Sequence, residues 1–476
     1  MHALQHVSAM LWVVGAYLSL MIVVGGYFYN KAKANGQETR DEFLLAGRGL
    51  GKIVAVGTIF ATYLGGGTVT GGGDSLAYNF GLWPGICFML PAIFGLVVLL
   101  LLSRKIRESN CYTTAQLLEK AYGPVARTLS AVIIAIAFIS IVSYQYRGLG
   151  FVLNATTGLS VETCTLICTF VVIALAFSGG LKTVAVTDAM SAFLMIGGMI
   201  IALPLLLKTV GGFAWIRETA SPEQLSFYGG QTFVKWIGAY LPLAFLTVGD
   251  QNFYQRINAA KDLKTARVGL LGCMIACIMV MPIIAVISLI GRLYFGTNIA
   301  AGQSLISTAT LLPFFWGGIL LSAASAFIIT TGDSYLLSAS SNITVDIYTR
   351  VINPKATDKQ QIFVTRSFIL LAGILAYLIL QFYPSILAIQ YMSYTIYAAA
   401  ITPAVLCALV WPKVTKIGGL ASMAIGTIFT IVWEVLKFPF GIQTIIVALP
   451  LSFVIIIVVS LLTQPSVCAQ SQEDEA

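Results

Sequence analysis

The segment that decides the fold reads Ala61-Thr62-Tyr63-Leu64-Gly65-Gly66-Gly67-Thr68-Val69-Thr70-Gly71-Gly72-Gly73, and it lies inside an otherwise apolar stretch. Six of its last nine residues are glycine, and each glycine in a helix interior costs about 1 kcal/mol relative to alanine. Unwound backbone at membrane depth is tolerated only where it is buried in protein or lines a cavity. Two interpretations follow: a membrane helix that is broken here, or a continuous helix whose glycines allow close packing.

The composition places the chain in a lipid bilayer. Of its 476 residues, 58% are hydrophobic and only 10% are charged, whereas soluble domains carry about 25% charged residues. The two histidines, His2 and His6, are both close to the N-terminus, which excludes histidine chemistry inside the membrane. Because the apolar segments contain no nucleophile–base pair or cofactor motif, we do not expect an enzyme. The net charge of +8 is explained by membrane topology, and no nucleic-acid partner is expected.

Apolar segments long enough to cross a membrane, about 20 residues each, recur along the whole chain and predict an all-α polytopic protein. We count thirteen of them: near 9–29, 50–78, 81–103, 125–153, 160–178, 181–208, 231–256, 266–291, 314–348, 364–382, 385–411, 415–436 and 444–463.

Most of the 27 basic residues lie in the loops after the odd-numbered segments. Since cytoplasmic loops carry the excess of Lys and Arg, we expect the N-terminus outside and the C-terminus in the cytoplasm. An odd number of spans agrees with this polarity. The expected location is the plasma (inner) membrane, crossed many times.

A second interrupted helix lies in the seventh segment, with a weak centre at 238–242 followed by the polar residues 247–252. Interrupted helices at corresponding places in two halves indicate a secondary transporter built from inverted repeats. Counting from the second segment, five spans form each repeat, so the second set has opposite polarity. The predicted divisions are a peripheral helix and loop (1–49), the repeats (50–208 and 231–411), two peripheral helices (412–463) and a cytoplasmic tail (464–476).

The stretch Thr330-Thr331-Gly332-Asp333-Ser334 brings polar oxygens into the middle of the ninth segment. A carboxylate at the bilayer centre costs about 2.5–3.5 kcal/mol even on lenient scales, so a cation, a proton or an internal partner must offset it. Hydroxyl and carboxylate oxygens without nitrogen or sulfur suit a hard cation. The alternative is a helix-packing motif, since small polar residues are common at membrane helix interfaces.

Four further segments resemble the sodium:solute symporter family, in order and across nearly the whole chain. They are Phe43-Leu44-Leu45-Ala46-Gly47-Arg48, Gly179-Gly180-Leu181-Lys182-Thr183-Val184-Ala185-Val186-Thr187-Asp188, Gln255-Arg256 with Ala259-Ala260-Lys261, and the helix from Thr330 to Tyr348. The resemblance implies thirteen helices around a five-plus-five inverted-repeat core of the LeuT type, with the first and sixth core helices broken.

By position, the resemblance implies a main Na⁺ site that joins the first and eighth core helices. Its ligands would be the carbonyls of Ala61, Leu64 and Phe327 with the hydroxyls of Thr330 and Thr331. Phe327 departs from the small residue usual in the family.

The resemblance also implies a second cation site made by Asp188, Asp333 and Ser334 with Thr330. We expect Na⁺ or H⁺ there, so that the coupling ions would be one or two Na⁺, with H⁺ as an alternative. Asp333 replaces the usual hydroxyl of the family. The competing interpretation makes Asp188 a structural partner of Lys182 or of helix-end backbone.

The solute is expected near the membrane midplane, beside the two breaks. The candidate residues for its site are Tyr63, Thr68, Trp83 and Thr247, although packing roles are equally open. Arg147 favours a solute with a carboxylate, which a guanidinium binds bidentately, unless its side chain reaches to the outer surface instead. Asp250 is expected to be an interfacial residue near the inner end of its helix.

The function predicted is Na⁺-coupled symport of a small organic solute by alternating access, with a preference for an amino acid or organic acid. Two alternatives stay open at this point: a proton-coupled transporter of the same fold, and a membrane-embedded solute sensor without transport. The partners expected are the solute and the lipid bilayer. The sequence leaves the oligomeric state open between a monomer and an oligomer.

Overall fold

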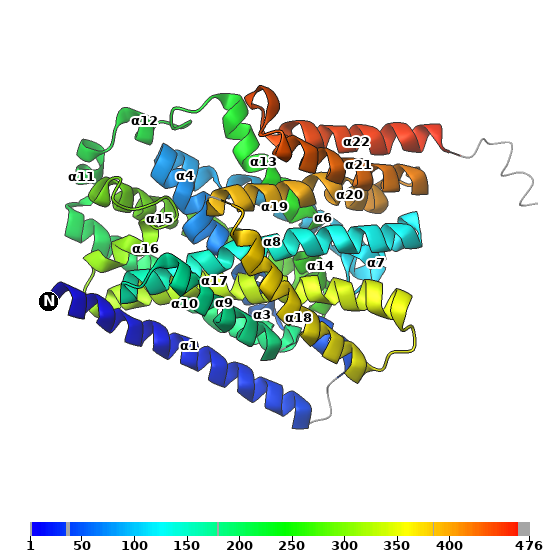
Figure 1. Ribbon diagram of the computed structural model, residues 1–476, viewed down its shortest axis with the longest axis horizontal. Helices are drawn as coiled ribbons and strands as arrows, with labels where there is room; N and C mark the ends of the chain where they lie inside the picture. Colours follow the sequence, from blue (N-terminus) through cyan, green and yellow to red (C-terminus); the bar gives the residue numbers. More distant parts are fainter. Residues whose placement is uncertain (1, 35–38, 179, 384, 465–476) are drawn as a thin grey trace, which may run out of the picture.

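A computed structural model describes residues 2–34, 39–178, 180–383 and 385–464. The chain is helical throughout these ranges, and most helices run along the long axis of the molecule (Figure 1). The predicted all-α fold is therefore confirmed. Most of the expected tail, from residue 465 on, lies outside the described residues.

The helices that form the bundle are α1 (His2–Ala34), α3 (Lys52–Tyr63), α4 (Gly72–Phe80), α6 (Leu90–Ser109), α8 (Pro124–Thr157), α9 (Val161–Ser178), α10 (Leu181–Val210), α13 (Phe233–Gly249), α14 (Gln251–Ala259), α15 (Leu263–Phe295), α17 (Phe314–Asn342), α18 (Asp358–Leu380), α19 (Ile386–Ala400), α20 (Thr402–Val410), α21 (Lys416–Val435) and α22 (Thr444–Leu462). Shorter helices connect them: α2 (Arg40–Leu45), α5 (Leu82–Cys87), α7 (Thr114–Tyr122), α11 (Gly212–Thr219), α12 (Pro222–Leu225) and α16 (Ser304–Thr308).

The number of membrane spans is only partly established. Within the described ranges, 10 helical segments are long and apolar enough to cross a membrane, and the bent pair α3–α4 makes 11. The other two expected spans are helical but fall short: α9 is a shorter apolar helix, and the seventh span is divided into α13 and α14. The count of thirteen and the boundaries of the repeats stay predictions.

The break in the second span lies where the glycine-rich segment predicts it. Helix α3 ends at Tyr63, and Leu64 has an extended backbone with φ −85° and ψ 105°. A π-helical turn, η2 (Gly67–Gly71), precedes α4, and the two halves are bent by 46°. The alternative of a continuous, closely packed helix is therefore wrong.

The break in the seventh span lies later than its weak centre suggests. Helix α13 is continuous through Pro242 and ends at Gly249, so residues 238–242 do not interrupt it. Asp250 is the extended residue between the two halves, with φ −61° and ψ 118°. Its side chain accepts a hydrogen bond from the Asn252 amide and so caps α14. A capping carboxylate starts a new helix here, whereas the proline was tolerated inside α13.

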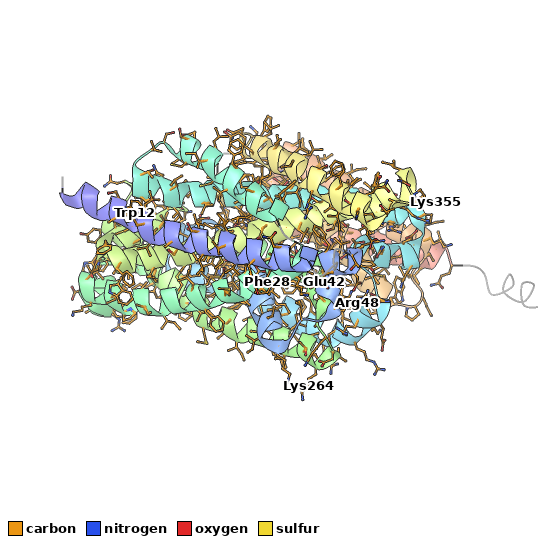
Figure 2. All side chains as sticks on the ribbon, turned by 90° about the horizontal axis from the view of Figure 1, so that it is seen from below. Trp12, Phe28, Glu42, Arg48, Lys264 and Lys355 are labelled. Atoms are coloured by element: carbon orange, nitrogen blue, oxygen red, sulfur yellow. The ribbon has the colours of Figure 1, made fainter. Side chains whose placement is uncertain are left out.

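The two broken spans are joined directly, at the start of α3 and the end of α14. Leu50, just before α3, donates its amide to the Ala259 carbonyl at 3.1 Å and accepts a hydrogen bond from the Lys261 amide at 3.1 Å. The start of α1 and the end of α22 lie at opposite ends of the bundle (Figure 1). Figure 2 shows Arg48, Lys264 and Lys355 on the far side of Phe28 from Trp12.

Helix α3 packs closely on α10 through a glycine. A Cβ atom built on Gly57 would lie 2.5 Å from the Cα of Ala189, so the two backbones touch at this point. This contact holds the helix that carries the first break against the helix that carries Asp188.

We expect Gly57→Val to lower the free energy of unfolding by about 1–3 kcal/mol, the usual cost of overpacking a well-packed core. The added side chain must push α3 away from α10. Thermal melting of the purified chain measures this loss. Gly197→Val is the matched control on α10, because a Cβ there would meet nothing within 4 Å. Equal melting temperatures of the two variants would contradict the prediction.

Candidate functional site

Two threonines of α17 face the carbonyl groups at the end of α3. The Thr330 hydroxyl oxygen lies 2.7 Å from the carbonyl oxygen of Ala61 and 2.7 Å from that of Ala326, one turn earlier in α17. The Thr331 hydroxyl donates to the carbonyl of Thr62 at 3.0 Å. The Ala61 carbonyl also lies 3.4 Å from Thr331 Oγ1. Because the last four carbonyls of a helix have no intrahelical donor, the break leaves these oxygens free to bond elsewhere. The result is a group of oxygens, buried in the bundle, that a hard cation prefers.

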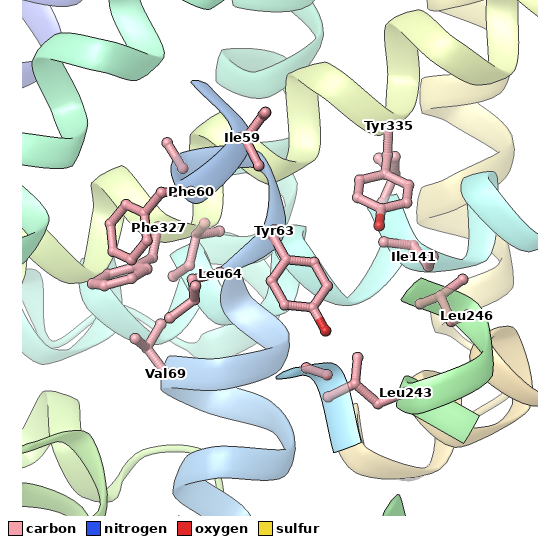
Figure 3. Packing of buried hydrophobic residues seen from close by; sticks show 14 of the residues in the cluster. Ile59, Phe60, Tyr63, Leu64, Val69, Ile141, Leu243, Leu246, Phe327 and Tyr335 are labelled. Atoms are coloured by element: carbon pink, nitrogen blue, oxygen red, sulfur yellow. The ribbon is translucent and has the colours of Figure 1, made fainter. Parts of the chain in front are cut away.

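The other two expected ligands of the main site also lie at this place. Leu64 is fully buried and takes the extended backbone that ends α3. The Phe327 carbonyl lies 3.4 Å from Thr330 Oγ1. The Phe327 ring packs edge-on against Phe60, with ring centroids 6.1 Å apart (Figure 3).

A buried arginine lies beside the proposed second cation site. The Arg256 guanidinium, 1% exposed, forms an ion pair with Asp188 at 3.3 Å and donates to Ser334 Oγ at 2.8 Å. Asp188 Oδ2 also accepts from the hydroxyls of Thr58 at 2.7 Å and Thr62 at 3.2 Å. The partner of Asp188 is therefore Arg256. Lys182, the partner considered from the sequence, pairs with Glu42.

Two carboxylate oxygens of this cluster accept no hydrogen bond from the described residues: Oδ1 of Asp188 and Oδ1 of Asp333. Asp333 is 7% exposed and lines a cavity between α1, α9, α10 and α17. A buried carboxylate without a partner is costly. The cluster holds two carboxylates and one guanidinium, so one positive charge is missing for neutrality.

Two of the expected solute residues touch each other. The hydroxyls of Tyr63 and Thr247 are 2.7 Å apart and join α3 to α13, and Figure 3 shows the Tyr63 hydroxyl pointing toward Leu243 and Leu246 of α13. Thr68 lies buried in η2, just beyond the break.

Trp83 and Arg147 lie in other surroundings. The Trp83 side chain is 42% exposed and packs on Phe227, with ring centroids 6.0 Å apart. The Arg147 guanidinium is only partly buried, and its Nη1 lies 3.4 Å from the carbonyl of Tyr383, at the connection between α18 and α19. The described contacts therefore do not bring either residue to Tyr63 and Thr247.

Two glutamines that sequence reasoning missed satisfy the broken backbone. Gln145 of α8 accepts a hydrogen bond from the Gly66 amide at 2.8 Å. Gln390 of α19 accepts from the Gly72 amide at 2.7 Å and donates to the Gly67 carbonyl at 3.0 Å. A Cβ on Gly66 or Gly67 would lie 2.4 or 2.5 Å from these amide groups. The glycines thus leave space for these polar side chains. The sequence signal that could have identified them is a glutamine within an otherwise apolar helix.

Asp250 was expected at an interface, and this is wrong: it is 1% exposed and lies in the second break. Its carboxylate accepts a short hydrogen bond from the Tyr335 hydroxyl of α17. The Tyr397 hydroxyl bridges the same break, donating to the Gly249 carbonyl at 2.8 Å and accepting from the Gln251 amide at 3.2 Å. Asp250, Tyr63 and Tyr335 line one small enclosed space, so the two breaks face each other.

Comparison with known proteins gives consistent matches over most of the chain. The profile of the Sodium:solute symporter family matches residues 43–426. The Sodium/proline symporter of Escherichia coli is 27% identical over 98% of this chain and 96% of its own length. The High-affinity proline transporter PutP of Bacillus subtilis is 26% identical, covering 92% and 95%. The High-affinity choline transporter 1 of Caenorhabditis elegans is 25% identical, covering 87% and 76%.

Solved structures share the fold. A Na⁺-coupled sialic acid symporter in a substrate-bound, outward-open state matches with a TM-score of 0.78 and 17% identity, covering 96% of this chain and 99% of that one. The transporter Mhp1, of the nucleobase-cation-symport-1 family, matches with a TM-score of 0.53 and 12% identity, covering 91% and 98%. These likenesses confirm the LeuT-like architecture.

We expect Gln390→Leu to destabilise the chain, because the Gly72 amide and the Gly67 carbonyl both lose their partner. Each buried, unsatisfied polar group costs about 1–3 kcal/mol. Thermal melting of the purified variant measures the effect. The control is Gln381→Leu. The Gln381 side chain is exposed and, among the described residues, donates to the Tyr377 carbonyl of its own helix. If Gln390→Leu and Gln381→Leu had the same melting temperature, the break would not depend on Gln390.

Proposed function

The chain belongs to the sodium:solute symporter family, and we propose that it takes up a small organic solute with Na⁺ held between the end of α3 and α17. The observation that carries this proposal is the pair of hydroxyls, Thr330 and Thr331, directed at the carbonyls of Ala61 and Thr62. A set of oxygen ligands at a helix break suits Na⁺, because the broken helix has carbonyls that accept no backbone hydrogen bond.

Na⁺ binding at this place would couple the ion to the shape of the transporter. Thr330 Oγ1 and Thr331 Oγ1 donate to the end of α3, so a cation there would take the place of direct hydrogen bonds between two helices. The site exists only while α3 and α17 stay close together. A ligand that binds one conformation better than another shifts the population toward it, and this is the physical basis of alternating access here.

A second cation at Asp188, Asp333 and Ser334 is part of the proposal. Arg256 neutralises one of the two carboxylates, and both Oδ1 atoms lack a partner among the described residues. One further positive charge, Na⁺ or H⁺, would complete the neutralisation. Thr62 connects the two sites, because its carbonyl accepts from Thr331 while its hydroxyl bonds Asp188 and Ser334.

For the solute we propose an amino-acid-sized molecule with a carboxylate. Three of the relatives are named as transporters of proline or choline, and proline carries both a carboxylate and a cationic nitrogen. Tyr63 and Thr247 join the two breaks and are the proposed contacts of the solute, together with Thr68. Arg147, a partly buried residue in the second half of α8, would attract its carboxylate before the solute reaches Tyr63 and Thr247, and Trp83 would act at the entrance. The proposed orientation keeps the N-terminus outside.

Uptake by proteoliposomes tests the proposed function. We expect accumulation of labelled proline to require an inward Na⁺ gradient, with K⁺ unable to replace Na⁺. Uptake of choline, lactate and sialic acid, measured in the same vesicles, identifies the class of solute. Uptake driven equally by a pH gradient without Na⁺ would overturn Na⁺ coupling, and uptake of sialic acid alone would overturn the solute class.

Within this assay, Thr330→Ala and Thr331→Ala should each raise the Na⁺ concentration for half-maximal uptake by about tenfold or more, because a lost hydroxyl ligand worth about 1.4 kcal/mol changes affinity tenfold. Ser325→Ala is the control on the same helix, since its hydroxyl bonds the Leu321 carbonyl of its own preceding turn. An unchanged Na⁺ dependence in both threonine variants would exclude this site.

The second cation makes a separate prediction. Asp333→Asn should lower the number of cations carried per solute by one. The asparagine is uncharged, so Asp188 and Arg256 already balance each other and no second cation is needed. Simultaneous measurement of ²²Na⁺, pH and solute flux gives the ratio and identifies the ion. Ser325→Ala should keep the wild-type ratio. If Asp333→Asn keeps it too, the second site is not a coupling site.

A further inference from the structure

Asp333 and Thr330, two residues of the proposed cation sites, also line a cavity at the apolar edge of the bundle. This cavity has a volume of about 430 Å³ and lies between α1, α9, α10 and α17. Figure 1 shows α1 running along the outside of the bundle, so that the cavity separates a peripheral helix from the core. Ligand sites typically measure about 300–1,000 Å³, and a dry cavity of about 150 Å³ already holds benzene.

The walls of the cavity are mostly carbon. Met21 and Ile22 of α1 face Phe170 and Val171 of α9 across it. Three of its other hydroxyls are engaged: Tyr17 and Ser191 bond each other at 2.9 Å, and Thr187 bonds carbonyls of its own helix. Apolar cavities of this kind exclude water, which argues against a hydrated inorganic ion as the occupant.

One charge is left facing these apolar walls. Oδ1 of Asp333 accepts no hydrogen bond, and no lysine or arginine among the described residues forms an ion pair with Asp333. Arg256, the nearby buried cation, is bound to Asp188 and Ser334. A carboxylate beside an apolar space complements a ligand with a cationic nitrogen and an apolar body, since an N–H⁺ donor to a carboxylate forms a strong, charge-assisted hydrogen bond.

The cavity also has a route of entry. Ile22 is 56% exposed and Phe170 is 66% exposed, so the two helices that flank the cavity carry apolar side chains on the lipid-facing surface. A molecule dissolved in the bilayer can therefore approach between α1 and α9 without crossing the polar centre.

We propose that the cavity between α1, α9, α10 and α17 binds a lipophilic organic ammonium ion, with its nitrogen against Asp333 and its apolar body along Met21 and Phe170. This ligand is neither the transported solute nor the coupling ion. Because Thr330 also lines the cavity, the bound molecule would lie next to the main Na⁺ site, where it could modulate transport from the membrane side.

The test measures binding without transport. The purified full chain is melted in K⁺ buffer, without Na⁺ or solute, at rising concentrations of n-hexylammonium or of hexan-1-ol. A ligand that binds only the folded state raises the melting temperature with concentration. We expect hexylammonium to stabilise the chain and hexan-1-ol, which has the same apolar body without the charge, to bind about tenfold more weakly or worse.

Three variants make the result specific. Asp333→Asn removes the charge and should abolish the difference between the amine and the alcohol. Gly26→Leu should fill the cavity, because Gly26 lines it and a Cβ there meets nothing within 4 Å; it should abolish stabilisation by both compounds. Gly15→Leu, three turns earlier on α1 and equally free of close contacts, should respond like the wild type.

The proposal is overturned if hexylammonium stabilises Asp333→Asn or Gly26→Leu as much as the wild type, or if the alcohol matches the amine. Absence of any stabilisation of the wild type also overturns it. Since no Na⁺ or solute is present, these outcomes are independent of the proposed symport. A failure of Na⁺-driven uptake would leave the melting result unchanged.

Discussion

The fold depends on one requirement: every backbone polar group inside the bilayer must find a partner within the protein. Two spans violate helical continuity, at Leu64 and at Asp250, and each break exposes amides and carbonyls. Side chains from helices distant in sequence supply the partners. Gln145 and Gln390 serve the first break, and the Tyr397 hydroxyl serves the second. The breaks are stable because the surrounding helices α8, α17 and α19 close around them.

The same requirement produces the chemistry of transport. Carbonyls released at the end of α3 are satisfied by the hydroxyls of α17, and the same oxygens would coordinate Na⁺ in the proposed site. A helix that kept its own hydrogen bonds would have no carbonyls to offer. Charge follows the same logic, since Asp188 is tolerated inside the bundle through Arg256, whereas Asp333 has no ion-pair partner among the described residues. The proposed Na⁺ site would therefore use the oxygens that hold α3 against α17.

Local sequence was a good guide wherever the cause was local. Glycine content predicted the first break, because helix propensity depends on the residues themselves. Proline and glycine were a poor guide to the second break: Pro242 lies inside α13, and the interruption occurs at Asp250, where a carboxylate caps α14 and Tyr335 and Tyr397 hold the gap. Local sequence also placed Asp250 at an interface, because it does not show which distant side chain the carboxylate meets. Its partner Tyr335 is 85 residues away along the chain.

The sequence by itself determined the membrane class, the all-α fold and the break at 61–73, and it singled out the threonine pair proposed as cation ligands, since hydropathy, propensity and donor chemistry belong to single residues and short stretches. Only the tertiary structure decided which groups meet: Arg256 with Asp188, the glutamines with the glycine backbone, Tyr63 with Thr247, and the cavity that Asp333 faces. It also separated Trp83 and Arg147 from that centre. These pairings depend on the relative register of helices far apart in sequence, which no local pattern encodes.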